Sequence, residues 1–168
     1  MMDEGTILLY RSHGFIGACI KAVTGMPWGH AATYLKGFTW ESTIWWSKIW
    51  FKTGIRITKG CSIADEFWKP KTPMTEEQAQ AELTYWLEKV NMRRPYNIPK
   101  LLILAIVYPL RRFFKKWVPF DEPFWGEECS SSVDEAKRAA GIDLFPKQQE
   151  GFTAPGDFRK SKLLELVV

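Results

Sequence analysis

The first hydrophobic runs of the chain are short and alternate between strand and helix patterns. Residues 6–11 (TILLYR) form a compact β-prone run, and residues 14–24 then carry apolar side chains at helical spacing. Cys19 lies on this apolar stripe, where a small buried core residue is the favoured interpretation. The chain is therefore expected to open with a strand followed by a helix.

Two β-prone runs come next, residues 30–35 and residues 38–46. Only Lys36 and Gly37 separate them, which predicts a two-residue hairpin turn in which glycine supplies a positive φ angle. The length of this turn determines the register of the two strands, and a change of one residue would move every side chain of one strand to the opposite face.

This register makes a specific prediction about two polar side chains. If Leu35 faces Phe38 across the turn, the antiparallel pairing continues along both strands. His30 and Glu41 then share one face of the sheet as diagonal neighbours, about 7 Å apart at the backbone. A glutamate side chain is long enough to bridge that gap.

Helical periodicity is clearest in two later segments. Residues 75–78 (TEEQ) form a capping box, and the apolar positions after it predict a helix from about residue 75 to residue 90. In the second segment, apolar or small side chains recur after Cys129 at spacings of four, three and four, and Gly141 supplies a C-terminal stop. Cys129 is therefore expected to begin a helix and to point inward.

The remaining segments carry weaker patterns. The tryptophan-rich residues 45–51 predict a loop, and one or two strands are expected over residues 55–58 and 61–68. Asn97 can cap a helix that bends or stops at Pro109. The longest apolar run is residues 101–110, whereas a membrane-spanning helix needs about twenty residues, so no transmembrane segment is expected.

The composition is that of an ordinary globular protein. Of 168 residues, 46% are hydrophobic and 25% are charged, which predicts a single domain over residues 1–168 with a substantial core. The three cysteines lack CxxC spacing, so neither a disulfide framework nor a structural zinc site is indicated. The two histidines lack an HExxH motif, and neither a metal nor another cofactor is expected.

The net charge of +4 is small and mostly scattered, so nucleic-acid binding is not expected. The N-terminus is acidic and lacks the features of a secretory signal, which favours the cytoplasm. One basic cluster is interleaved with aromatic residues. It fits either a peripheral segment on anionic lipid or a solvated face whose aromatic neighbours pack inward. The cluster consists of Arg111, Arg112, Lys115 and Lys116.

A thiol, an imidazole and a carboxylate occupy recognisable positions in this predicted scaffold. Cys129 is expected at a helix N-terminus, whose unpaired amides lower a thiol pKa and can receive the oxyanion of a tetrahedral intermediate. His30 would act as base and then acid, while Glu41 would orient the ring and stabilise its charged form. Each residue alone is better explained as structural, but their combination favours a cysteine-nucleophile enzyme.

The order of these residues along the chain, His, Glu and then Cys, is opposite to that of papain. Together with several short motifs, it resembles the circularly permuted branch of the NlpC-type papain-like cysteine hydrolases. That branch includes the YiiX-like and YaeF-like bacterial proteins and, more distantly, the lecithin:retinol acyltransferases. The resemblance spans most of the chain, and its motifs are residues 5–10 (GTILLY), 24–30 (TGMPWGH), 34–41, 95–96 (PY), 129–130 (CS) and 153–157 (TAPGD).

The resemblance implies an α+β fold of the permuted papain-like type, in which a small antiparallel sheet or half-barrel packs against helices. It implies that Cys129 is the nucleophile, His30 the base and Glu41 the third polar member. Tyr96 and Ser130 would contribute to the substrate or oxyanion site. The expected activity is that of a cysteine peptidase or amidase, which forms a thioester acyl-enzyme and cuts an amide bond in a peptide such as a cell-wall stem peptide.

Two other functions are compatible with the sequence. A lipid-directed thioesterase or acyltransferase would use the same triad and dock through the basic-aromatic cluster. A non-catalytic binding module of the same fold would use the tryptophan-rich segment. Glu127 and Glu128 stand where apolar residues are more usual, and their charge would oppose thiolate formation near the sulfur. The sequence leaves the oligomeric state open.

Overall fold

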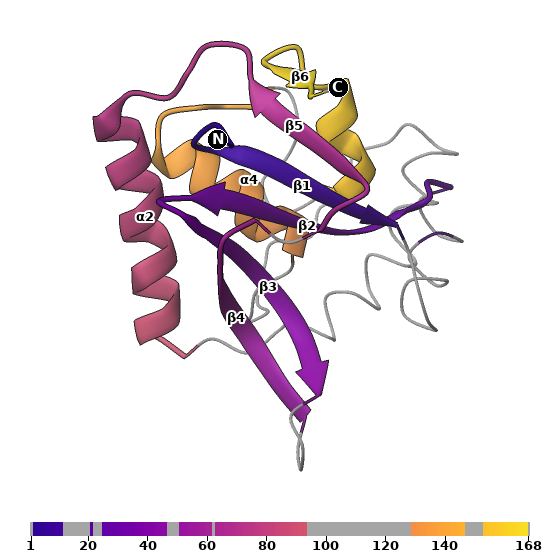
Figure 1. The fold of residues 1–168 in the computed structure, drawn as a ribbon, viewed down its shortest axis with the longest axis vertical. Coiled ribbons are helices and arrows are strands. Elements are labelled where there is room, and N and C mark those ends of the chain that lie inside the picture. The colour runs from indigo at the N-terminus through magenta and orange to yellow at the C-terminus, as the bar shows by residue number, and fades with distance from the viewer. Residues whose placement is uncertain are drawn as a thin grey trace.

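The structure is a computed structural model with mixed α and β content arranged around one antiparallel sheet (Figure 1). The residues that it describes are 2–11, 21, 25–46, 51–61, 63–93, 129–146 and 153–167. The strands within these ranges are β1 (Thr6–Arg11), β2 (Trp28–Leu35), β3 (Phe38–Trp46), β4 (Phe51–Lys59), β5 (Glu66–Pro70) and β6 (Leu164–Leu166). The helices are α2 (Glu76–Asn91), α4 (Cys129–Ala139) and the 3-10 helix η1 (Pro155–Lys160).

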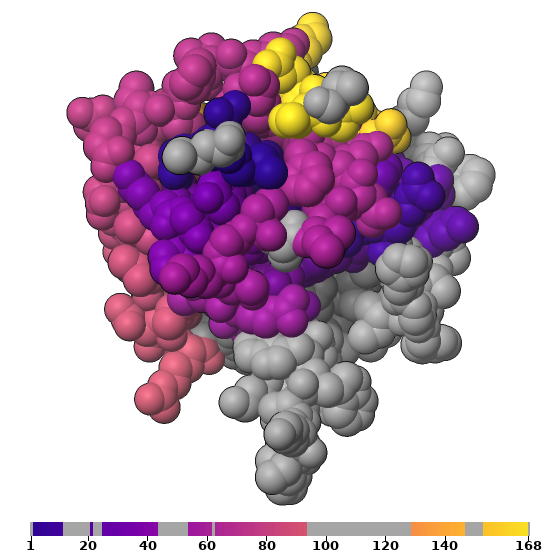
Figure 2. Space-filling model, viewed as in Figure 1, coloured from indigo at the N-terminus to yellow at the C-terminus, as the bar shows by residue number. Residues whose placement is uncertain are grey.

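The sheet has six strands in the order β4-β3-β2-β1-β5-β6, and each neighbouring pair is antiparallel. Strands from both ends of the sequence therefore belong to one sheet. Helix α4 contacts β2, β3 and α2, and it lies behind the sheet in the view of Figure 1. The space-filling view from the same side shows strand side chains, helix α2 along the left side and the C-terminal segment among the coloured residues (Figure 2).

The predicted hairpin and its register are confirmed. Leu35 pairs with Phe38, and the connecting residues Lys36 and Gly37 have φ angles of 51° and 81°. Two consecutive positive φ angles are typical of a turn whose twist matches that of the flanking strands. The turn thus sets the pairing of β2 with β3 from its first residue pair onward.

The predicted helix starts are confirmed as well. The Thr75 side chain accepts a hydrogen bond from the Gln78 amide and the Gln78 side chain accepts one from the Thr75 amide, so the capping box opens α2. Helix α4 begins at Cys129, and Gly141 follows it with a φ of 74°. No helix within the described ranges is both long and apolar enough to cross a membrane.

The predicted loop over residues 45–51 is too long. Strand β3 continues to Trp46 and β4 already begins at Phe51. Aromatic and β-branched residues favour the extended backbone of paired strands, and this preference outweighs the loop interpretation at both ends of the segment. Several predictions lie outside the described residues: the helix over 97–107, Cys19, and the basic cluster of Arg111, Arg112, Lys115 and Lys116. Of the helix predicted over 14–24, residue 21 alone is described, and it is helical.

The hydrophobic core lies between the sheet and the helices. Strand β1 contributes Ile7 and Leu9, α2 contributes Trp86, α4 contributes Val133 and η1 contributes Phe158, all fully buried in one cluster. The predicted inward positions after Cys129, namely Val133, Ala136 and Ala140, are buried. Most of the polar residues of α4 are buried too, so the burial extends beyond the predicted stripe. Burial of this apolar surface supplies the main driving force that holds α4 against the sheet.

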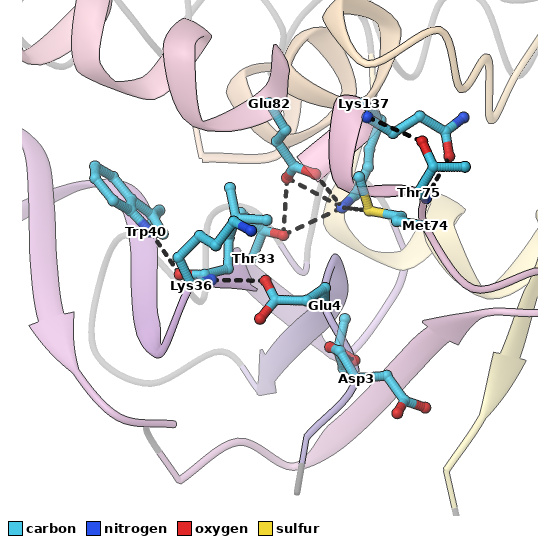
Figure 3. Close-up of polar contacts among 12 residues, drawn as sticks. Asp3, Glu4, Thr33, Lys36, Trp40, Met74, Thr75, Glu82 and Lys137 are labelled. Carbon is cyan, nitrogen blue, oxygen red and sulfur yellow. Dashed lines mark hydrogen bonds and ion pairs between the residues drawn. The ribbon is translucent and has the colours of Figure 1, made fainter. Parts of the chain in front are cut away.

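A charged pair is buried beside this core (Figure 3). Lys137 of α4 and Glu82 of α2 are both 0% exposed, and the Lys137 Nζ atom lies 2.7 Å from Glu82 Oε2 and 3.0 Å from Oε1. The Thr33 hydroxyl of β2 donates to Glu82 Oε1 at 3.0 Å and lies 3.3 Å from Lys137 Nζ. Burial lowers the Lys137 pKa, and attraction to Glu82 opposes that effect. The three residues therefore join two helices and the central sheet.

Removal of one partner of this buried pair is expected to cost far more stability than removal of a surface charge. Lys137→Met should lower the free energy of unfolding by about 3–5 kcal/mol, because Glu82 stays buried without a compensating charge. Lys36→Met, the same change in a surface pair with Glu76, should cost about 1 kcal/mol or less. Urea denaturation followed by circular dichroism measures both.

The double variant Lys137→Met/Glu82→Leu distinguishes the cost of an unpaired buried charge from the cost of lost packing. It should be more stable than Lys137→Met, because neither buried charge remains. Equal stability of Lys137→Met and the wild type would contradict the structure of this cluster.

Candidate active site

The first element of the candidate site is a hydrogen bond between neighbouring strands. His30 of β2 and Glu41 of β3 meet at 2.5 Å between Nε2 and Oε2. The Glu41 side chain is 4% exposed and that of His30 is 22% exposed. The contact agrees with the register predicted from the hairpin, which places the two residues on one face as diagonal neighbours. Glu41 thus holds the imidazole ring by one nitrogen.

The second element is the contact between His30 and Cys129, which joins β2 to the first residue of α4. Burial alone would lower the His30 pKa, but a hydrogen bond and charge attraction to Cys129, followed by those to Glu41, raise it to about 10. The His30 imidazole is therefore protonated at neutral pH and lies against the Cys129 sulfur. An adjacent imidazolium is the kind of neighbour that lowers a thiol pKa.

One ring nitrogen of His30 is engaged by the carboxylate. The Nε2 atom bonds Glu41, so Nδ1 is the ring nitrogen that this contact does not use. The carboxylate, the ring and the thiol therefore form a linear chain of contacts. Such an arrangement fixes the ring orientation while leaving its proton available to a leaving group.

Glu41 has a second cationic partner that the sequence did not identify. Arg56 of β4 donates from Nε to Glu41 Oε1 at 2.7 Å, and its Nη2 atom lies 2.6 Å from the same oxygen. Burial would raise the Glu41 pKa, but contacts with His30 and then Arg56 hold it below its usual value. The carboxylate therefore stays charged. Strand periodicity gave no signal for this contact, because the register of β3 with β4 was not predicted.

Tyr10 is another site neighbour that the sequence did not identify. It lies directly opposite His30 in the pairing of β1 with β2, and the two ring centroids are 5.3 Å apart in a tilted arrangement. A ring packed beside the imidazole restricts its rotation. The register of β1 with β2 shifts between Tyr10 and Arg11, next to this pair.

The first turn of α4 is held by the C-terminal segment. The Ser130 hydroxyl donates to the carbonyl of Thr153, and the Thr153 hydroxyl donates to Asp134 at 3.0 Å. One carboxylate oxygen of Asp157 accepts from the Ala154 amide at 3.0 Å, so this side chain stabilises the start of η1. Residues 153–157, one of the family-like motifs, therefore dock against the helix that begins with Cys129.

The structure brings together Cys129, His30 and Glu41, with Ser130 adjacent to the thiol. The Ser130 hydroxyl donates to the Thr153 carbonyl. Within the described ranges, no three His, Cys, Asp or Glu residues are placed to hold a metal ion. The predicted site residue Tyr96, and the acidic Glu127 and Glu128, lie outside the described residues.

Comparison with known proteins gives no family to which the chain can be assigned. No model of a known protein family matches the sequence, and no curated protein matches it either. The function is therefore inferred from the site itself.

The ionisation of the site can be tested on His30 directly. In an NMR titration, His30 should titrate near pH 10, whereas the ordinary value is 6.5. Because the folded-state pKa is raised, the stabilisation by the imidazolium is complete below about pH 6.5 and is lost as pH rises through about 10.

The assignment is checked with Cys129→Ala and Glu41→Gln, each of which removes one contact that raises the His30 pKa and should therefore lower it. His13, the other histidine of the sequence, supplies the second titrating resonance. A His30 titration near 6.5 in the wild type would disprove the ion pair.

Proposed function

We propose that the chain is a cysteine hydrolase of the permuted papain-like class that acts through a thioester acyl-enzyme. The observation that carries the proposal is the continuous contact from Cys129 through His30 to Glu41. The nucleophile begins a helix, while the base and its orienting carboxylate lie on neighbouring strands that precede it in the sequence. The mixed antiparallel architecture and the His, Glu, Cys order support the permuted class.

The proposed reaction begins with attack of the Cys129 thiolate on the carbonyl carbon of an amide or ester. The C–S bond forms, the carbonyl π electrons move to oxygen, and a tetrahedral oxyanion results. His30 then transfers its Nδ1 proton to the leaving nitrogen or oxygen as the scissile bond breaks, which leaves a thioester and a neutral imidazole. Water attacks the thioester, His30 accepts its proton, and the acid product leaves with regeneration of the thiolate.

The N-terminus of α4 supplies a place for the oxyanion. The first backbone N–H groups of a helix have no partner within the helix, and the helix dipole adds partial positive charge there. The amides at Cys129 and Ser130 belong to this first turn. One such donor contributes about 3 kcal/mol to catalysis in studied enzymes. The same helix start therefore favours both the thiolate and the oxyanion.

The substrate proposed is a peptide amide such as that of a cell-wall stem peptide. It follows from the resemblance to the NlpC-type hydrolases and not from the site geometry. A second candidate is an acyl lipid, favoured by the basic-aromatic segment that includes Arg111 and Lys115. Both substrates would pass through the same acyl-enzyme, so the chemistry can be tested before the substrate is known.

The acyl-enzyme can be trapped with a generic donor. Incubation with p-nitrophenyl acetate should add one acetyl group to Cys129, detected by mass spectrometry of the intact and digested protein. Cys129→Ala should abolish this adduct, and His30→Ala should slow its formation by about a hundredfold or more, since base and acid catalysis are both lost. Cys61→Ala removes an exposed thiol and should leave the adduct unchanged.

The two substrate classes are then compared with the same variants. Muropeptides test the peptide assignment, and phosphatidylglycerol vesicles test the lipid assignment, each with Cys129→Ala as the inactive control. Absence of acetylation at Cys129 in the folded wild type would contradict a hydrolase and favour a binding module.

A further inference from the structure

The contacts of Glu41 divide its two oxygens between two cations. Oε2 bonds the His30 imidazole, whereas Oε1 receives both the Nε and the Nη2 groups of Arg56. Because each oxygen has its own partner, the carboxylate plane has little freedom to rotate away from the imidazole. A buried carboxylate also needs such compensation, because an unpaired charge in this environment is costly.

The pairing of β3 with β4 places Arg56 for this role. Glu41 and Arg56 are direct cross-strand partners in the antiparallel ladder. The Arg56 side chain is 44% exposed, and its guanidinium contacts a carboxylate that is only 4% exposed. Two donors in a fixed plane hold a carboxylate more rigidly than the single ammonium group of a lysine. This geometry differs from that of an ordinary surface ion pair, whose carboxylate is solvated.

We propose that Arg56 is a positioning residue that keeps Glu41 ionised and aimed at His30, so that the imidazolium–thiolate pair persists into acidic solution. The inference rests on the proposed function. The groups that face this carboxylate come from neighbouring elements: His30 from β2 and Arg56 from β4. Cys129 of α4 and Tyr10 of β1 act on it only through the imidazole.

The positive charge of Arg56 should shift the protonation of Glu41 to lower pH. Glu41 has a depressed pKa, so its interaction with His30 is intact at neutral pH and is lost as pH falls through the folded-state value. Without the guanidinium, Glu41 takes up a proton at a higher pH. A neutral carboxyl group holds an imidazolium less strongly, and the thiolate population then declines earlier on acidification.

The test is the rate of Cys129 alkylation by iodoacetamide between pH 4 and pH 9, measured by mass spectrometry of the Cys129 peptide. A small electrophile is used because Cys129 is only 4% exposed. In Arg56→Gln the acid limb of the profile should move to higher pH, because Glu41 is protonated earlier on acidification. The rate at pH 5 should fall about tenfold or more, because the neutral carboxyl group no longer holds the imidazole in place and misplacement of a catalytic group is costly. Arg56→Lys should keep the acid limb near that of the wild type but lower the plateau rate.

Lys59→Gln is the matched control, because it removes one positive charge from an exposed position on the same strand and should leave the profile unchanged. Circular dichroism and thermal melting establish that each variant is folded. Should Arg56→Gln fail to fold, Arg56→Lys decides the matter, since a plateau equal to that of the wild type would overturn the positioning role.

The outcomes separate this inference from the proposed function. Rapid wild-type alkylation of Cys129 with unchanged Arg56→Gln and Arg56→Lys profiles would remove the role of Arg56 alone. Wild-type alkylation of Cys129 no faster than that of the exposed Cys61 would overturn the reactive thiolate, and with it both proposals.

Discussion

The buried pair of Lys137 and Glu82 is the interaction on which the arrangement of this protein depends. It links α4 to α2, and through Thr33 it links both helices to β2. A buried charge tolerates few displacements, because movement out of contact leaves its partner uncompensated. The helix that begins with Cys129 and the strand that carries His30 are therefore held in one relative position. Apolar packing drives the association of the helices with the sheet, whereas the charged pair fixes their positions relative to one another.

The candidate site continues the same principle with charges that alternate in sign. The His30 imidazolium, the Glu41 carboxylate and the Arg56 guanidinium follow one another from β2 across β3 to β4, and the Cys129 sulfur of α4 lies against the imidazolium. Each charge is stabilised by its neighbours, so these groups stay ionised although they are partly removed from water. This is why a histidine that burial alone would deprotonate remains protonated near neutral pH.

Much of the scaffold was predictable because its signals are local. The Lys36-Gly37 turn defines a register within a few residues, and that register alone brought His30 and Glu41 onto one face. The capping box at Thr75 likewise marks a helix start through contacts three residues apart. The ends of β3 and β4 were predicted less well, since an aromatic-rich segment satisfies both a loop and a strand interpretation until the pairing of the strands is known.

The sequence by itself therefore determined the hairpin, the helix that starts at Cys129 and which three side chains to expect at the candidate site, because each depends on neighbours in the chain. Only the tertiary structure decided that Lys137 is buried, that Arg56 shares Glu41 with His30, and that Ser130 and Thr153 tie the C-terminal segment to α4. A lysine or arginine in a sequence suggests a solvated surface. Its burial or its partner is decided by residues far away in the chain, which come into contact only when the sheet and the helices assemble.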